Sequence, residues 1–211
     1  MSTSTFEDTL LNPQNCALVL LDQQAGLSFG VQSIDRQALV NNSVALLETA
    51  LAFALPMVVS TSASKVYSGP LLPDLQALIP GHPVIDRRNM NVWEDAAGQA
   101  AIVATGRKKL LFSGMLTEAC ISFAVLSALQ DGYDCYVVAD ACGGLTVTGH
   151  DLALRRMEAH GARMTSWLQV VLELQRYWTR KETYAGARAV IEKNGGGYGI
   201  GLRYASAMLP K

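Results

Sequence analysis

The sequence predicts an α/β fold, a three-layer α/β/α sandwich of Rossmann-like type around a mainly parallel, six-stranded sheet. Three observations predict it. Short apolar runs alternate with longer segments of helical periodicity along most of the 211 residues. The short runs are apolar at consecutive positions, which is typical of strands that helices cover on both faces. Strands that alternate with helices along a chain usually form a parallel, doubly wound sheet.

The six predicted strands are the short apolar runs. They are residues 16–22, 56–61, 82–86, 108–114, 133–140 and 162–166. The segments between and after them carry apolar residues at helical spacing. The predicted helices are residues 35–55, 71–79, 94–106, 118–132, 149–161 and 167–178. Gly106 and Gly132 each end a helix, where glycine readily adopts the left-handed conformation of the last turn.

The last part of the chain, residues 181–211, is predicted to be a helix to about Lys193 and then a tail. The tail begins with the glycine-rich stretch NGGGYGIG, residues 194–201. The glycines of a phosphate loop follow a strand, whereas these follow a helix, so we interpret the stretch as a flexible tail or a subunit contact. Neither a linker nor an internal repeat divides the sequence, so residues 1–211 are predicted to form a single domain.

Composition and charge argue against several classes of partner. Half of the residues are hydrophobic, 17% are charged and the net charge is −1, so there is no electrostatic case for binding nucleic acid or a membrane surface. No apolar run approaches the roughly 20 residues of a membrane-spanning helix. The polar, acidic start MSTSTFEDTLLNPQN does not resemble a secretory signal, which predicts a cytoplasmic protein with reduced thiols.

The cysteines and histidines give no indication of a metal site. The four cysteines show neither a CxxC pair nor zinc-site spacing, and the three histidines form no recognisable metal-binding pattern. We therefore expect neither a catalytic metal nor a cofactor.

Chemistry in such a fold is expected beyond the carboxyl ends of the strands, where open parallel sheets bind their ligands. The residues at these ends include a carboxylate, a cation and a thiol. Asp22 ends the first predicted strand, Arg87 follows the third and Cys120 follows the fourth. Three complementary groups at one edge of a sheet indicate a site more strongly than any one of them alone.

Cys120 is predicted to lie in the first turn of a helix. Free backbone N–H groups and the positive end of the helix dipole would lower the pKa of a thiol there and could also hold an oxyanion. A packed cysteine is an equally good interpretation of the position, because free cysteines are commonly buried.

Asp22 and Arg87 each have a functional and a structural interpretation. Asp22 could accept the proton of Cys120 and later donate it to a leaving group, or it could simply cap a loop. Arg87 could hold the charges of the carboxylate and the thiolate together, or it could be a solvated surface arginine. Arg88 stands beside it, and the sequence leaves open which of the two points inward.

Five further residues near the same edge are candidates for contact with a small-molecule substrate. Side chains on these loops could equally pack at the edge of the sheet. The candidates are Gln24, Phe29, Asn91, Trp93 and Thr117.

Four stretches of the sequence resemble the isochorismatase-like cysteine hydrolase superfamily and, within it, the YcaC-like hydrolases. They are ALVLLDQQAGL (17–27), VIDRRNMNVWED (84–95), GMLTEACISFAVLSALQDGYDCYVVADACG (114–143) and RMTSWLQVVLELQRYW (163–178). The resemblance extends over about residues 12–180 and implies the isochorismatase-like sandwich. Members that resemble this sequence are homo-oligomers, so the resemblance also implies an assembly between a dimer and an octamer.

The resemblance implies a catalytic triad of Asp22, Cys120 and a cation, which is lysine in the superfamily and is matched here by Arg87. Arginine keeps its proton, so it can act only as a fixed cation and a hydrogen-bonding fork. The resemblance also implies a cis peptide bond between Met115 and Leu116. The backbone N–H groups of Leu116 and Cys120 would then form an oxyanion hole.

The activity implied is metal-independent hydrolysis of a small amide or related C–N bond through a thioester acyl-enzyme. Nicotinamidase members carry a histidine in a DxH metal site after the acid, whereas Gln23 and Gln24 follow Asp22 here. Two alternatives stay open. One is a non-catalytic member that binds a small molecule or serves as an interaction platform. The other is a thiol redox protein in which Cys142 resolves Cys120.

Overall fold

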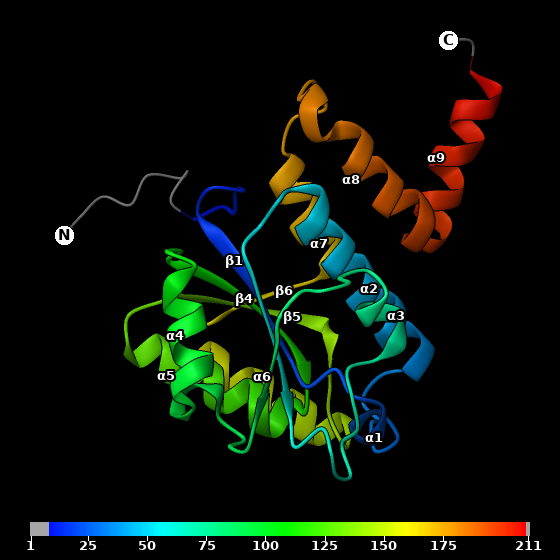
Figure 1. Cartoon of the computed structure of the whole chain (residues 1–211). Coiled ribbons are helices and arrows are strands. Elements are labelled where there is room, and N and C mark those ends of the chain that lie inside the picture. The colour runs from blue at the N-terminus through cyan, green and yellow to red at the C-terminus, as the bar shows by residue number, and fades with distance from the viewer. Residues whose placement is uncertain (1–8, 210–211) are drawn as a thin grey trace.

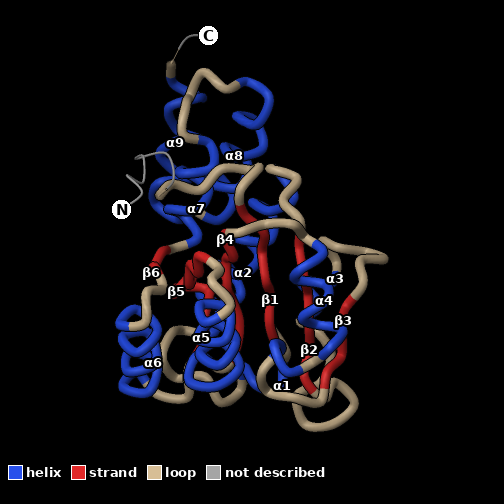
Figure 2. Tube along the Cα trace, turned by 90° about the vertical axis from the view of Figure 1, so that its left-hand side faces the viewer, coloured by secondary structure: helices blue, strands red, loops and turns tan. Residues whose placement is uncertain are grey.

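A parallel sheet of six strands forms the centre of the molecule, and helices cover both of its faces (Figure 1 and Figure 2). The computed structural model describes residues 9–209. The strand order is β3-β2-β1-β4-β5-β6, and every neighbouring pair is parallel. The strands are β1 (Cys16–Leu21), β2 (Met57–Ser62), β3 (Val84–Arg87), β4 (Lys109–Met115), β5 (Asp134–Gly143) and β6 (Arg163–Thr165).

The helices divide between the two faces of the sheet (Figure 1). One face is covered by α2 (Arg36–Ala52), α3 (Pro73–Gln76), α7 (Trp167–Gln175) and α8 (Lys181–Asn194). The other is covered by α4 (Ala96–Ala104), α5 (Ser122–Gln130) and α6 (Val147–Ala159). The short helix α1 (Ala25–Ser28) follows β1, and α9 (Gly196–Met208) follows α8. The predicted fold class, a three-layer α/β/α sandwich, is confirmed.

The central strand β1 shows why the predicted strands are apolar at consecutive positions. All six of its residues are buried. Leu18 and Leu20 pack into the cluster under α2, α7 and α8, whereas Val19 and Leu21 pack into the cluster under α4, α5 and α6. Successive side chains of a strand point to opposite faces, so a strand with two covered faces needs apolar residues throughout.

The strand order places a switch point between β1 and β4. From β1 the chain adds β2 and β3 on one side of the sheet and then returns to add β4, β5 and β6 on the other. The crevice at such a switch point, beyond the carboxyl ends of the strands, is where open α/β sheets bind ligands. Asp22 directly follows β1, and the segment that carries Cys120 directly follows β4.

The structure corrects the prediction for the C-terminal tail. Residues 196–208, expected as a flexible tail or a subunit contact, form the helix α9, which packs against α8; the helix rules out the flexible tail. Gly196, with φ +52°, makes the break between the two helices. At Gly199 the helices approach so closely that an added Cβ would lie 2.4 Å from the carbonyl oxygen of Ile191. The glycine at this position therefore allows the two helices to pack closely. The sequence did not predict a helix here because glycine has a low helical propensity.

Several element boundaries differ from the prediction by a few residues, and the short helix α1 was not predicted. Two of the differences lie near the site. The helix expected from residue 118 begins as a single turn of π-helix, Thr117–Ile121, before α5 starts. Strand β5 continues to Gly143, and its register against β4 shifts between Phe112 and Gly114. Within residues 9–209, none of the helices combines the length and the apolar character that crossing a membrane requires.

Candidate active site

Asp22 lies at the switch point and is completely buried. It directly follows β1, and its backbone N–H donates to the carbonyl oxygen of Ser60 on β2 at 2.8 Å. Its φ of +56° lies in the left-handed region, which aspartate tolerates better than most residues and which occurs often at functional sites. The unusual backbone turns the chain out of the strand while the carboxylate stays inside the molecule.

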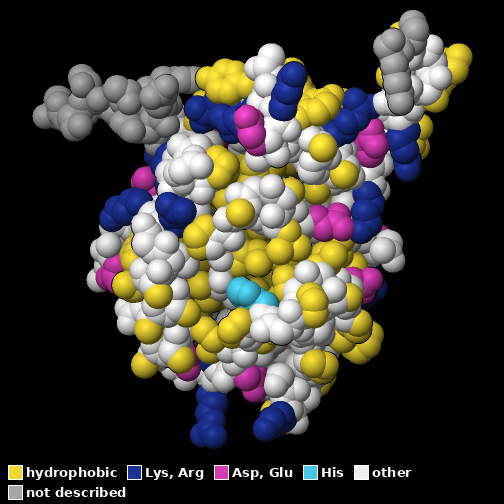
Figure 3. All heavy atoms as spheres, turned by 45° about the horizontal axis from the view of Figure 1, so that its top comes forward, with side chains coloured by type: hydrophobic (Ala, Val, Ile, Leu, Met, Phe, Trp, Pro, Cys, Tyr) yellow, Lys and Arg dark blue, Asp and Glu magenta, His cyan; other side chains and the backbone are white. Residues whose placement is uncertain are grey.

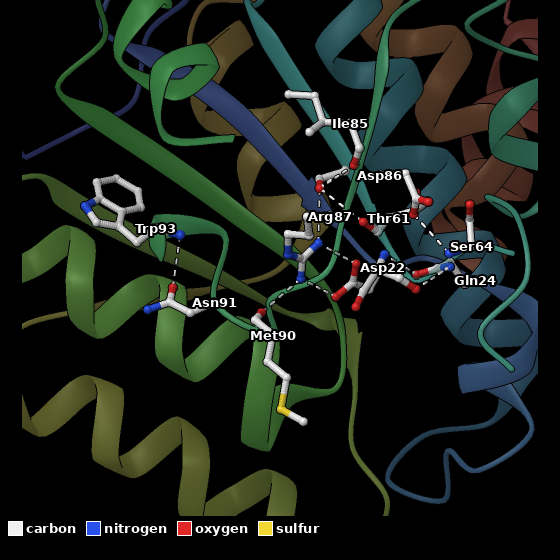
Figure 4. Close-up of polar contacts among 12 residues, drawn as sticks. Asp22, Gln24, Thr61, Ser64, Ile85, Asp86, Arg87, Met90, Asn91 and Trp93 are labelled. Carbon is white, nitrogen blue, oxygen red and sulfur yellow. Dashed lines mark hydrogen bonds and ion pairs between the residues drawn. The ribbon is translucent and has the colours of Figure 1, made fainter. Parts of the chain in front are cut away.

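Arg87, the last residue of β3, supplies the cation (Figure 4). Its guanidinium donates to both oxygens of Asp22, from Nη1 to Oδ1 at 2.7 Å and from Nη2 to Oδ2 at 2.5 Å. It also donates to Ser60 Oγ at 3.1 Å and to the carbonyl oxygen of Met90 at 3.0 Å. Arg87 is 1% exposed, whereas Arg88 is exposed, so Arg87 is the inward-pointing arginine that the sequence could not identify.

Cys120 completes the group from the opposite side of the switch point. It lies in the π-helical turn Thr117–Ile121 and is 7% exposed. Hydrogen bonding between its thiol and the Asp22 carboxylate raises the pKa of the thiol, and hydrogen bonding to the backbone N–H of Leu116 lowers it. The structure therefore brings Asp22, Arg87, Leu116 and Cys120 together.

The pKa of Cys120 differs from the sequence-based expectation. Burial, the charge of Asp22 and the hydrogen bond to it raise the pKa of the thiol to about 12, and Arg87 and the Leu116 N–H oppose that shift. The expected lowering by a helix N-terminus is wrong for the resting site, because the adjacent carboxylate and the loss of solvent outweigh the N–H groups. The resting cysteine is a thiol that donates to Asp22.

Burial also raises the pKa of Asp22, and the hydrogen bonds and charge of Arg87 act against this. Arginine keeps its charge in proteins. A protonated Asp22 would leave that charge buried without a counterion, so the ionised carboxylate is the form that fits the site. Because burial raises the pKa of Asp22 while Arg87 counteracts that rise, the carboxylate is well placed to accept a proton and to return it.

Gly114 brings β4 and β1 close together shortly before the π-helical turn Thr117–Ile121. It has φ +151°, and an added Cβ would lie 1.7 Å from the carbonyl oxygen of Leu21. Only glycine fits such an approach. The next peptide bond, between the buried Met115 and Leu116, is cis.

Of the five candidate substrate contacts, Gln24 and Thr117 are buried and already hydrogen-bonded. The Gln24 side chain accepts from the N–H of Ser62 at 2.9 Å and donates to the carbonyl oxygens of Ser62 and Gly69. It thereby holds the loop after β2 beside the site (Figure 4). The Thr117 hydroxyl lies 2.8 Å from Nδ1 of His150.

Asn91 and Trp93 lie on the far side of Arg87 from Asp22 (Figure 4). Asn91 accepts the N–H of Trp93 and donates to Ser127 of α5 at 3.0 Å. The Trp93 indole N–H donates to Asp131 at 2.7 Å. The contacts in the structure thus turn both side chains toward α5 and not toward Cys120.

Phe29, at the end of α1, is 73% exposed. The inference from the sequence missed a second exposed side chain, Met90, whose carbonyl oxygen binds Arg87 and which is 63% exposed. It also missed Ser60, Glu118 and His150. Ser60 lies within a buried strand and His150 is a single histidine near a helix start, and neither position carries a sequence signal.

The described part of the chain contains no cluster of side chains that could bind a metal ion. Among residues 9–209, no group of three or more His, Cys, Asp or Glu side chains could hold a metal ion. All four cysteines are free thiols, and Cys16, Cys135 and Cys142 are completely buried.

Comparison with known proteins gives the relationship of this chain. Residues 16–169 match the isochorismatase domain. The probable hydrolase YcaC of Escherichia coli (strain K12) is 38% identical over 169 residues, which are 80% of this chain and 81% of YcaC.

Two solved structures have the same fold over nearly the whole chain. The YcaC gene product from Escherichia coli, described as an octameric hydrolase of unknown specificity, has a TM-score of 0.92 at 34% identity, with 98% of this chain and 100% of that chain covered. YcaC from Pseudomonas aeruginosa, solved with hexane-2,5-diol and covalent acrylamide, has a TM-score of 0.90 at 33% identity, with 97% and 100% covered. Because the domain match and the YcaC alignment both extend over most of the sequence, the chain belongs to the isochorismatase family and is a YcaC-like hydrolase.

Proposed function

We propose that the protein is a metal-independent cysteine hydrolase that cleaves the C–N bond of a small amide through a thioester acyl-enzyme. Asp22, Arg87 and Cys120 are the proposed triad. The observation that carries the proposal is a single buried carboxylate, Asp22, that both accepts from the thiol of Cys120 and is held by two hydrogen bonds from Arg87. Thiol, base and fixed cation are the parts that nucleophilic attack on a carbonyl needs.

The first half-reaction begins with the thiol protonated. As Cys120 Sγ attacks the amide carbonyl carbon, its proton passes to the Asp22 carboxylate, so a free thiolate need not accumulate. The carbonyl oxygen becomes an oxyanion, which the N–H groups of Leu116 and Cys120 stabilise. Asp22 then gives its proton to the departing nitrogen, the C–N bond breaks, and a thioester and a free amine remain.

The second half-reaction returns the enzyme to its starting state. Asp22 takes a proton from a water molecule as the water oxygen attacks the thioester carbonyl. The C–S bond breaks, the acid is released, and Cys120 recovers the proton from Asp22. Arg87 keeps its charge throughout and holds the carboxylate in one orientation.

A relative supports a reactive thiol. YcaC from Pseudomonas aeruginosa is described with covalent acrylamide. Acrylamide adds to nucleophilic thiols. Cys120 is the cysteine in this chain that is both partly exposed, at 7%, and bound to a carboxylate, so we propose that it reacts in the same way.

The substrate is proposed to be small. Phe29, one of the five candidate contacts, and Met90, which the sequence did not indicate, are exposed and free to contact it. The other four candidates shape the loops and turns around it through the contacts described above; they are Gln24, Asn91, Trp93 and Thr117. Asp22 and Arg87 neutralise each other, which favours an uncharged amide as the substrate.

The protein is proposed to act as a homo-oligomer. The Escherichia coli YcaC structure is described as octameric. Helix α9 extends away from the sheet, and hydrophobic side chains lie exposed near the C-terminal end of the chain (Figure 1 and Figure 3). The exposed residues of α9 include Ile200 at 59% and Tyr204 at 65%, which offer an apolar face to another subunit. We propose a cytoplasmic location, which suits four free thiols.

The test is to trap the acyl-enzyme. The protein is mixed with a panel of small aliphatic and aromatic primary amides, quenched in acid and analysed by intact mass. We expect an acyl adduct that maps to Cys120, with release of ammonia, and loss of both in Cys120→Ser. Ammonia release that persists in Cys120→Ser, or no turnover of any amide, would contradict the proposal.

A further inference from the structure

The catalytic turn is fastened to the segment between β5 and α6 by contacts outside the triad. Thr117, which directly follows Leu116, is completely buried. Its hydroxyl oxygen lies 2.8 Å from Nδ1 of His150, in the first part of α6. Along the chain, Thr117 lies between Leu116, whose N–H is hydrogen-bonded to the thiol, and Cys120 itself.

Glu118 makes a second contact with the same segment. Its Oε1 accepts the N–H of Leu145 at 2.9 Å. The carboxylate lies so close to Gly144 and Gly149 that a Cβ added to either would come within 3.0 Å of it. The two glycines leave room for Glu118 beside the N-terminus of α6, where a negative charge is favourable. We name Thr117, Glu118, Leu145 and His150 together the α6 anchor.

We propose that His150, acting through Thr117, is a positioning residue that holds the Leu116–Cys120 turn in the orientation needed for its N–H groups to face the reacting carbonyl. The proposal rests on the proposed function and adds a residue to it. Glu118 assists by fixing the adjacent residue of the turn. The hydrogen bonds of the two side chains go to Thr117 and to the N–H of Leu145, so their effect would pass through the backbone of residues 116–120.

The protonation state of His150 agrees with the proposed positioning role. Burial lowers its pKa, against the charges of Asp151 and Glu118, so the ring is neutral near pH 7. With the proton on Nε2, Nδ1 accepts from the Thr117 hydroxyl. A buried hydroxyl with a fixed acceptor has one orientation, which restricts the turn that carries it.

The experiment compares four single variants and the double variant His150→Ala/Thr117→Val. His150→Ala removes the acceptor, whereas His150→Asn keeps an oxygen close to the place of Nδ1. Thr117→Val removes the hydroxyl at nearly constant volume. His160→Ala is the matched control, because His160 is the exposed histidine at the other end of α6 and its ring contacts only the carbonyl oxygen of Arg156 among the hydrogen bonds found.

The first readout is hydrolysis of an amide identified in the acyl-enzyme screen. We expect kcat to fall about 10- to 100-fold in His150→Ala and in Thr117→Val, with KM changed less than about threefold, because displaced N–H groups weaken stabilisation of the transition state more than binding. His150→Asn should recover most of kcat. The double variant should be no slower than the slower single variant, since both changes remove one contact.

The second readout does not need hydrolysis. The rate of acrylamide addition to Cys120, followed by intact mass at pH 8, should fall about threefold or more in His150→Ala and Thr117→Val. The reason is that a displaced Leu116 N–H no longer lowers the pKa of the thiol. If the wild type hydrolyses no amide but these rates change as expected, the proposed function fails and the positioning role stands.

Three results would overturn the positioning role. They are wild-type adduct rates and kcat in both His150→Ala and Thr117→Val, an equal loss in His150→Asn, and an equal loss in His160→Ala. Circular dichroism and thermal unfolding establish that each variant is folded. Should His150→Ala fail to fold, Thr117→Val and His150→Asn decide the matter in the same way.

Discussion

At the scale of single residues, the site depends on a buried ion pair. Asp22 and Arg87 are both completely enclosed and share two hydrogen bonds. Removing one partner of such a pair leaves the other charge buried, which costs more than the pair itself contributes. The pair is therefore sensitive to loss of either member, whatever its net value to stability.

The prediction at this scale concerns Arg87. We expect Arg87→Met to lower the free energy of unfolding by about 3–5 kcal/mol, because Asp22 is left without its counterion. Arg88→Met, a change of the same chemistry at an exposed neighbour, should stay within about 0.5 kcal/mol. Urea unfolding measures both. Equal effects of the two substitutions would show that Arg87 is not the buried partner.

At the scale of elements, the position of the turn that carries Cys120 depends on the close approach of β4 to β1. Gly114→Ala would place a Cβ against the Leu21 carbonyl oxygen at a backbone conformation that favours glycine. We expect a loss of more than about 4 kcal/mol in the free energy of unfolding, or no folded protein. Gly132→Ala is the matched control. It also has a positive φ but meets only the end of the Lys108 side chain, so about 1 kcal/mol is expected.

Urea unfolding of Gly132→Ala and the yield of folded Gly114→Ala are the measurements. A Gly114→Ala protein as stable as Gly132→Ala would mean that the strands separate easily at this point. The turn after β4 would then be held by its other contacts, including the α6 anchor.

The helices and strands also show how much of the structure the sequence predicts. The strands were recognised because burial on both faces requires continuous apolar runs, and the site edge followed from their parallel order. The helix α9 was not recognised, because four glycines lower its intrinsic propensity and only packing against α8 supports it. The choice between Arg87 and Arg88, and the contact of Thr117 with His150, depend on tertiary packing that a local pattern does not contain.

The pKa of the Cys120 thiol could not be predicted from the sequence for a different reason. The position of Cys120 after β4 was predicted from the sequence, but its pKa was not. A helix N-terminus alone would lower that pKa, whereas the structure adds burial and the charge of Asp22, which raise it. Burial is the largest cause of the shift, and the charge that adds to it belongs to a residue about a hundred positions away in the sequence, on the other side of the switch point.

At the scale of the whole molecule, the proposed homo-oligomer predicts subunit contacts through α9. Its exposed apolar residues Ile200 and Tyr204 are four positions apart and so lie on one face of the helix. We expect Ile200→Lys/Tyr204→Lys to give a smaller assembly by light scattering, with unchanged circular dichroism. An assembly of wild-type mass would place the subunit contact elsewhere.

The measurement that tests the central claim most directly is the pH dependence of Cys120 alkylation by iodoacetamide, followed by intact mass, in the wild type and in Asp22→Asn. The claim is that Asp22 and Cys120 share one proton. The wild-type rate should rise with pH to above pH 10 without a plateau, because the pKa of the thiol is raised to about 12. Burial remains in Asp22→Asn, but the negative charge that adds to the raised pKa is gone, so this variant should alkylate faster at pH 8 and yet lose amide hydrolysis. A wild-type plateau below pH 8, together with the same profile in Asp22→Asn, would contradict the claim.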